Sequence, residues 1–165
     1  MTIATTERLL INTWQQTDIP HYAALVSNPE VMRYIGDGHT PTYEEAKAYV
    51  LKSMKSYEDN GWSRFPIFLK ETEELIGFCG YMAIDNRIDF GWRLAQQHWG
   101  KGYATEAAKA VLKLGINLFH FPEITCVVYQ ENIASIRVIE KLGIPFDKDI
   151  TLNGNQAKQY VLIGT

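Results

Sequence analysis

Residues 97–105, QHWGKGYAT, combine the residue types of an anion-binding loop. Gly100 and Gly102 would let the backbone turn tightly and approach a ligand closely. The residues that follow have helical periodicity, so the first N–H groups of that helix and its dipole would attract an anion. Lys101 would add a positive charge at the same place. The segment therefore predicts a site that can hold a pyrophosphate group.

Other loops that join a strand to a helix share some of these features. The segment lacks the G-x-x-x-x-G-K-[ST] pattern of a Walker A loop. It is also a poor match to the dinucleotide pattern G-x-G-x-x-G/A, because Thr105 stands where the third small residue belongs. From the loop alone, a tight turn that binds nothing stays open as an alternative.

The loop is expected to lie between a strand and an amphipathic helix. Apolar residues occupy every second position from 88 to 94, the period of two that is typical of a strand with two different faces. From 104 to 118 the apolar residues recur at helical spacing. Further strands are expected at residues 8–14, 64–70, 75–82, 124–129, 146–152 and 158–163, and further helices at 18–26, 28–34, 42–60 and 132–142.

These elements predict one mixed α/β (α+β) domain over residues 1–165. Short connections between the strands from 64 to 94 favour antiparallel pairing. The helices would then pack on an antiparallel-rich sheet, because the apolar face of each element must be buried against another.

Composition argues against several classes of protein. The net charge of −3 does not suit a general nucleic-acid binder. No run of about 20 apolar residues is present to span a membrane, and the first residues do not resemble a secretory signal. The four histidines show no metal-ligand spacing, so we predict no metal. Cys79 and Cys126 lie in strand-like apolar runs and are expected to be buried thiols, which fits a cytoplasmic protein.

Three segments together resemble the GNAT superfamily of N-acetyltransferases. Gln97-x-x-Gly100-x-Gly102 is similar to its acetyl-CoA pyrophosphate motif, Q/R-x-x-G-x-G/A. Residues 89–94, DFGWRL, resemble the central strand before that motif, and residues 132–143, NIASIRVIEKLG, resemble its later N-x-x-S helix. The opening residues 6–11, TERLLI, resemble the first strand of the branch that acetylates ribosomal-protein N-termini. The likeness covers nearly the whole chain.

The resemblance implies where acetyl-CoA, the co-substrate, would bind on a GNAT fold. The mostly antiparallel sheet would splay open beside the cofactor, and the pantetheine arm would lie between the strand ending near Leu94 and strand 124–129. The N–H of Leu94 would polarise the thioester carbonyl, as an oxyanion hole does. Asn132 would contact the pantetheine arm as well as cap its helix. Besides Gln97, the pyrophosphate would be held by backbone N–H groups of Gly100, Lys101, Gly102, Tyr103, Ala104 and Thr105.

Two side chains are candidates for the chemistry. The resemblance implies that the Ser135 hydroxyl stabilises or protonates the leaving thiolate; a place in the first turn of its helix is the alternative. Asp89 is the candidate base, because an acceptor amine must lose its proton to attack. An ordinary aspartate, with a pKa of about 3.9, is a weak base unless burial raises its pKa or water relays the proton. A solvated Asp89, or one paired with Arg87 or Arg93, is the alternative.

The leading interpretation is direct acetyl transfer to a primary amine, with a protein or peptide N-terminus favoured by the resemblance. A small amine such as a polyamine, an amino sugar or an antibiotic is the second choice. A non-catalytic acyl-CoA sensor on the same fold and a nucleotide-binding oxidoreductase stay open as other classes. An acyl-enzyme on Cys126 is a minor alternative. The sequence does not predict an oligomeric state.

Two further expectations concern the surroundings of the site. Relatives often read Leu-Gly-Phe where this chain has residues 142–146, LGIPF, and Pro145 would alter that sheet edge by removing a ladder donor. The acceptor is expected on the side of the N-terminal helices and the loop at 36–41, where Tyr34, His39 and Trp62 are possible walls.

Overall fold

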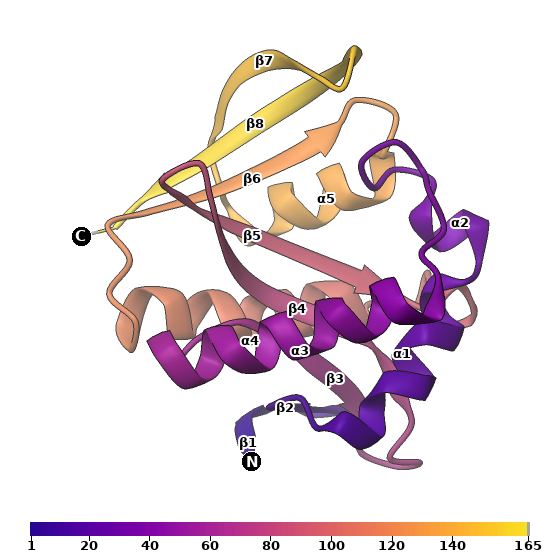
Figure 1. Ribbon diagram of the computed structural model, residues 1–165. Coiled ribbons are helices and arrows are strands. Elements are labelled where there is room, and N and C mark those ends of the chain that lie inside the picture. The colour runs from indigo at the N-terminus through magenta and orange to yellow at the C-terminus, as the bar shows by residue number, and fades with distance from the viewer. Residues whose placement is uncertain (165) are drawn as a thin grey trace.

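The computed structural model describes residues 1–164 and has an eight-stranded sheet with strand order β1-β2-β3-β4-β5-β6-β8-β7 (Figure 1). The strands are β1 (Thr2–Thr5), β2 (Leu9–Asn12), β3 (Arg64–Leu69), β4 (Leu75–Ile84), β5 (Arg87–Leu94), β6 (Glu123–Tyr129), β7 (Phe146–Leu152) and β8 (Asn155–Ile163). The helices are α1 (Ile19–Val26), α2 (Pro29–Met32), α3 (Tyr43–Asn60), α4 (Tyr103–Asn117) and α5 (Ile133–Leu142), with short 3₁₀ helices η1 (Gln16–Asp18) and η2 (Gln96–His98). The predicted mixed α/β fold with an antiparallel-rich sheet is confirmed.

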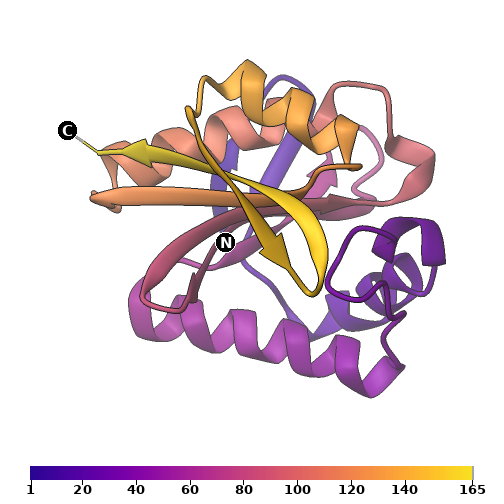
Figure 2. The same cartoon turned by 90° about the horizontal axis from the view of Figure 1, so that it is seen from above.

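The helices cover both faces of the sheet. Seen from above, α1 and α3 lie on one face and α4 and α5 on the other (Figure 2). The apolar stripe of α4, with Ala108 and Val111, is fully buried against the sheet. On the opposite face, Tyr22 of α1 and Val50 of α3 pack on Phe78 of β4. The two cores hold the central strands between two helical layers, which is how an α/β domain buries both sheet faces.

One pair of neighbouring strands differs from all the others. Antiparallel pairing joins each neighbouring pair except β5 and β6, which are parallel and follow one another through α4. Within the described residues a single residue pair, Asp89 and Thr125, joins these two strands. Beyond that pair the backbones of β5 and β6 diverge (Figure 1), and we call the region between them the opening.

Several helix ends follow the sequence rules. Asn28 accepts the Glu30 N–H at 3.0 Å, and Thr42 accepts the Glu45 N–H at 3.2 Å, as expected of N-caps. Gly61 ends α3 with a φ of 79°. Asp18 behaves differently, because its carboxylate accepts the Gln15 N–H at 2.8 Å in η1 instead of capping α1.

The structure corrects the prediction at the N-terminal edge and in two segment boundaries. β1 was not expected, because its four residues lack a clear alternation, and its pairing with β2 defines it. The strand predicted at 8–14 ends at Asn12, after which the indole N–H of Trp14 donates to the Arg64 carbonyl at 2.7 Å. The helix predicted at 28–34 is one turn long.

The β7 edge of the sheet has a shifted register, which begins after Pro145. Pro145 precedes β7, and its carbonyl accepts the Val161 N–H at 2.9 Å. The register of β7 against β8 shifts between Phe146 and Lys148. Among residues 1–164, no helix has the length and apolar character that crossing a bilayer requires.

Candidate active site

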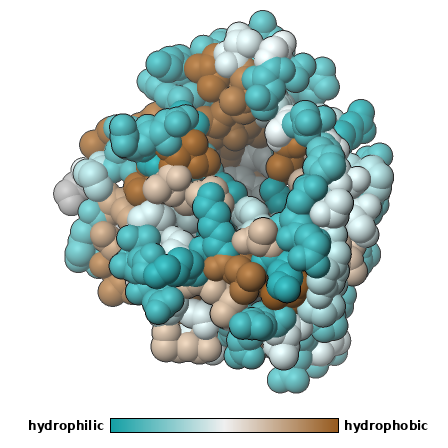
Figure 3. All heavy atoms as spheres, viewed as in Figure 1, coloured by the Kyte–Doolittle hydropathy of each residue, from teal (hydrophilic) through white to brown (hydrophobic). Residues whose placement is uncertain are grey.

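The edge of β5 that faces the opening carries free backbone donors. The Ala95 N–H donates to Ile76 on β4 at 2.8 Å. Because N–H groups along a strand alternate between its two edges, the Leu94 N–H points the other way, toward β6. The one pair that joins β5 to β6 lies five residues earlier, at Asp89. The predicted Leu94 donor therefore faces the opening, and the space-filling view shows the surface hollowed in that region (Figure 3).

The loop after β5 has the conformation that its glycines predict. Gly100 and Gly102 have φ angles of 74° and 82°, in the left-handed region that favours glycine. The Glu106 N–H donates to the Gly102 carbonyl at 3.0 Å, which is the first hydrogen bond of α4. The N–H groups of residues 103–105 come before that bond and have no acceptor within the helix. They sit at the positive end of a 15-residue helix, an arrangement that attracts anions.

Long-range contacts hold the two ends of this loop. The Trp99 indole N–H donates to the Leu94 carbonyl at 2.9 Å. The Arg8 guanidinium donates from Nη1 to the Lys101 carbonyl, also at 2.9 Å. The second contact joins residues 93 positions apart in the sequence, and the sequence analysis missed it.

Three residues separate the end of β6 from the start of helix α5, and Figure 1 shows α5 behind the opening between β5 and β6. Asn132 is its N-cap, with Oδ1 accepting the Ser135 N–H at 3.3 Å. The capping role predicted for Asn132 is confirmed. Ser135 is half-buried in the first turn of α5. The fold thus places this turn, the end of β5 and the start of α4 around one opening.

Asp89 lies on the face of β5 that is covered by α3, where it is 9% exposed. Its Oδ2 accepts from Arg64 Nη2 at 2.5 Å, and both side chains are 12% exposed. The predicted alternatives, a solvated aspartate or one paired with Arg87 or Arg93, are wrong. Burial raises the pKa of Asp89, while the charges of Arg64 and Arg87 and the hydrogen bond from Arg64 oppose that rise.

Arg64 is the central residue of a cluster that the sequence analysis did not find. Its Nη1 donates to the Tyr49 hydroxyl at 3.1 Å, and its guanidinium lies 5.4 Å from the centroid of the Phe78 ring. A Cβ at Gly91 would stand 3.1 Å from Arg64 Nη2. Gly91 therefore leaves the space that the guanidinium fills beside Asp89. A glycine inside a strand signals such a close approach, but it does not say which side chain comes near.

Two of the residues proposed as acceptor walls, Trp62 and His39, have other contacts, and the nearby loop at 36–41 is joined to β6. Trp62 packs edge-on against Phe121 at 5.1 Å between ring centroids, within the core cluster on the α4 face. His39 Nε2 lies 2.9 Å from a carboxylate oxygen of Glu45 on the surface. Tyr129 donates from its hydroxyl to the Gly36 carbonyl at 2.5 Å, and so joins the loop at 36–41 to the end of β6.

The chemistry of the cysteines agrees with the sequence analysis. Cys79 and Cys126 are buried free thiols, and burial raises the pKa of both. A neutral thiol is a poor nucleophile, so the geometry does not favour an acyl-enzyme on Cys126. Within residues 1–164 no group of three or more His, Cys, Asp or Glu side chains is arranged to hold a metal ion.

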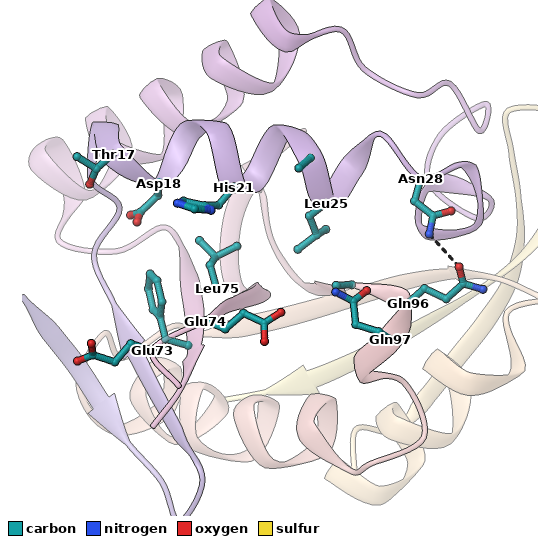
Figure 4. A pocket seen from close by; sticks show the side chains of 13 residues that line it. Thr17, Asp18, His21, Leu25, Asn28, Glu73, Glu74, Leu75, Gln96 and Gln97 are labelled. Atoms are coloured by element: carbon teal, nitrogen blue, oxygen red, sulfur yellow. Dashed lines mark hydrogen bonds between the residues drawn. The ribbon is translucent and has the colours of Figure 1, made fainter. Parts of the chain in front are cut away.

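A separate groove of about 540 Å³ lies between α1, the β3–β4 turn and η2 (Figure 4). Asn28 donates to the side-chain oxygen of Gln96 at 2.8 Å across one end. Figure 4 shows the Gln97 side chain pointing toward α1. The Gln97 amide therefore lies on the groove side of the loop.

Known proteins resemble the chain in sequence. The family model for the acetyltransferase (GNAT) domain matches residues 8–145. The chain is 36% identical over 143 residues to the uncharacterized N-acetyltransferase YnaD of Bacillus subtilis, covering 85% of this chain and 81% of that protein. It is 25% identical over 140 residues to spermidine N(1)-acetyltransferase of Escherichia coli, covering 82% of this chain and 72% of that protein.

Solved structures resemble it in fold. A GNAT acetyltransferase from Bacillus anthracis matches with a TM-score of 0.85 and 28% identity, covering 99% of this chain and 98% of that one. RimL, described as a ribosomal L7/L12 alpha-N-protein acetyltransferase in complex with coenzyme A, matches with a TM-score of 0.86 at 17% identity. The match covers 99% of this chain and 98% of the RimL chain. At that identity RimL supports the fold alone. By its sequence match and its architecture, the chain belongs to the GNAT acetyltransferase family.

Proposed function

We propose that this N-acetyltransferase moves an acetyl group from acetyl-CoA to a primary amine by direct transfer. The observation that carries the proposal is the meeting of two features at one end of the sheet. One is the β5 edge that faces away from β4 and, within residues 1–164, pairs with no strand beyond Asp89. The other is the N-terminus of α4 behind two left-handed glycines.

The residues present fit acetyl-CoA. Backbone N–H groups at residues 100–105 would bind its pyrophosphate, with Lys101 adding charge and Gln97 supporting the loop from the groove side. The free edges of β5 and β6 would pair with the amides of the pantetheine arm. Asn132, beside the end of β6, would contact the same arm. The thioester supplies the activated acetyl group.

The transfer itself needs three groups from the chain. The Leu94 N–H would donate to the thioester oxygen, where negative charge develops as the amine attacks. The new C–N bond forms while the C–S bond breaks, and the Ser135 hydroxyl would donate to the departing sulfur. Asp89 would take the proton that the amine loses, through a water molecule, because its carboxylate is already bound to Arg64.

A protein or peptide N-terminus is the acceptor we propose. Support comes from the opening residues 6–11, which resemble the ribosomal-protein branch. A small amine is the second candidate, and the spermidine acetyltransferase relative favours it. The two acceptors differ in size and charge, so an acceptor panel separates them.

The test is release of free coenzyme A thiol from acetyl-CoA. The acceptors would be short peptides with N-terminal Ala, Ser or Met, together with polyamines and amino sugars. Thiol release with the peptides, and an acetyl mass gain on their N-termini, is the expected result. Release with small amines alone would move the acceptor to the second candidate. Coenzyme A binding without turnover of any acceptor would favour a sensor over an enzyme.

Two variants test the proposed roles, each with a matched control. Ser135→Ala and Asp89→Asn should lower kcat while coenzyme A binding is retained. Ser27→Ala, on an exposed serine at the end of α1, and Asp59→Asn, on an exposed aspartate paired with Lys55, should leave kcat unchanged. Wild-type kcat in Ser135→Ala would remove that hydroxyl from the mechanism.

A further inference from the structure

Arg8, immediately before β2, contacts the loop and the helix that follows it at three points. Its Nη1 donates to the Lys101 carbonyl at 2.9 Å. Its guanidinium carbon lies 4.4 Å from the centroid of the Tyr103 ring. Its Nε donates to Glu106 Oε2 at 2.7 Å. One planar side chain thus contacts residues on both sides of Gly102.

The contact with Lys101 determines where the next N–H points. The Lys101 carbonyl and the Gly102 N–H belong to one peptide unit, which is planar and trans. In such a unit the C=O and N–H point in opposite directions. Because the carbonyl is held toward Arg8, the Gly102 N–H is turned away from Arg8. Arg8 therefore sets the direction of one of the backbone donors of the loop.

The loop has little other packing to hold that direction. An added Cβ at Gly100 would meet no atom within 4 Å, and at Gly102 it would meet Arg8 Nη2 at 3.4 Å. Glycine also has the widest range of backbone conformations, so an unsupported pair of glycines would adopt many arrangements. Binding an anion would then carry the cost of ordering the loop.

Glu106 fixes Arg8 in turn. Its Oε1 accepts the Thr6 hydroxyl at 2.6 Å and the Arg8 N–H at 2.8 Å, while Oε2 accepts from the guanidinium. A carboxylate in the first turn of α4 would repel a phosphate bound at the helix start. The ion pair with Arg8 offsets that charge, so the same contact orients the loop and compensates Glu106.

Arg8 reaches the loop from the side away from the opening. The strand that follows Arg8, β2, is separated from β5 by β3 and β4, while the opening lies between β5 and β6. We propose that Arg8 is a positioning residue for acetyl-CoA, which holds the loop in its anion-binding conformation without touching the reacting atoms. The inference rests on the proposed function, because it assigns the loop to the pyrophosphate.

Equilibrium titration with coenzyme A is the first test. Arg8→Met should raise its Kd about tenfold, the loss expected when one or two charge-assisted hydrogen bonds that order a site are removed. Arg8→Lys keeps the charge but cannot make the forked contacts, so it should lose a similar factor. Arg33→Met, on an exposed arginine 3.8 Å from Glu30, is the control and should bind as the wild type does.

A second donor separates positioning from a general loss of structure. S-acetyl-pantetheine has the thioester but no pyrophosphate, so its kcat/KM should be the same in Arg8→Met and in the wild type. With acetyl-CoA, Arg8→Met should raise KM and leave kcat unchanged. If Arg8→Met proves too unstable to purify, Arg8→Lys provides the same comparison.

Each of three results would overturn the proposal. Wild-type coenzyme A affinity in Arg8→Met would show that the contact does not order the loop. Wild-type affinity in Arg8→Lys would assign the effect to charge and not to orientation. An equal loss with S-acetyl-pantetheine would indicate a structural role alone. Absence of coenzyme A binding by the wild-type protein would instead refute the proposed function, and the inference with it.

Discussion

Replacing Arg64 with methionine would leave the Asp89 carboxylate buried without its main counter-charge. Both side chains of the pair are only 12% exposed, so solvent screens their interaction little. Removing one partner of such a pair costs about 3–5 kcal/mol. A domain has a total stability of about 5–15 kcal/mol. Arg64→Met should therefore remove a large part of the free energy of unfolding.

The assay is urea unfolding of four proteins: the wild type, Arg64→Met, Asp89→Leu, and Arg64→Met combined with Asp89→Leu. The double variant should be more stable than Arg64→Met, because an apolar pair leaves no buried charge without a partner. A cost below about 1 kcal/mol for Arg64→Met would place the pair in the range of exposed ion pairs and refute the reasoning.

The pH dependence of Arg64→Met adds a second check with a definite sign. Without Arg64, burial acts with less opposition and raises the pKa of Asp89 further above its unfolded value of about 3.9. A carboxyl with a raised folded-state pKa destabilises the fold above that pKa. The deficit of Arg64→Met should therefore shrink as the pH falls through the folded-state pKa toward 3.9. A deficit that does not change over this range would contradict the assignment to Asp89.

Three further predictions concern α4 and α5. Gly115→Ala should destabilise the protein by about 1–3 kcal/mol in urea unfolding, because the new Cβ would clash with the Tyr81 hydroxyl. Alanine usually favours helices over glycine, so a gain in stability would show that Tyr81 can move. Burial would raise the pKa of Glu106, but hydrogen bonds from Thr6 and Arg8 bring it below 4.5. The stabilising effect of the Glu106 carboxylate should be present above pH 4.5 and be lost as the pH falls through the folded-state pKa. Glu106→Gln should therefore weaken the fall of the free energy of unfolding at acid pH. An unchanged fall would contradict this prediction. Asn132→Ala should cost about 0.5–2 kcal/mol in thermal unfolding through loss of the α5 cap, and an unchanged midpoint would mean that the cap contributes nothing.

Much of the fold was predictable because its signals are local. The alternation in β5 and the helical stripe of α4 depend on residues close together in the chain, and both elements formed as expected. The glycine loop between them was predictable for the same reason, since φ angles near 80° need glycine whatever lies nearby. β1 gave no such signal, because its existence depends on pairing with β2.

The side-chain partners in the site were not predictable in the same way. Arg64 and Asp89 are 25 residues apart, and Arg8 and Lys101 are 93 apart. Several arginines could reach either position in a chain of unknown register. The alternative considered for Asp89 therefore paired it with the nearby Arg87 or Arg93, and Arg64 was not considered. Gly91 was a local signal that some group approaches β5 closely beside Asp89, because its missing side chain makes room for Arg64.

The Arg64 pair connects the stability of the protein with the basicity of Asp89. Burial makes Asp89 a better base than an exposed aspartate, and the guanidinium opposes that effect. Without Arg64 the carboxyl would be more basic, but the fold would contain a charge without a partner. With Arg64 the fold tolerates the carboxylate, and the proton acceptor is weaker. The proposed mechanism routes the proton through water because the carboxylate is already bound to Arg64 and the residue is only 9% exposed.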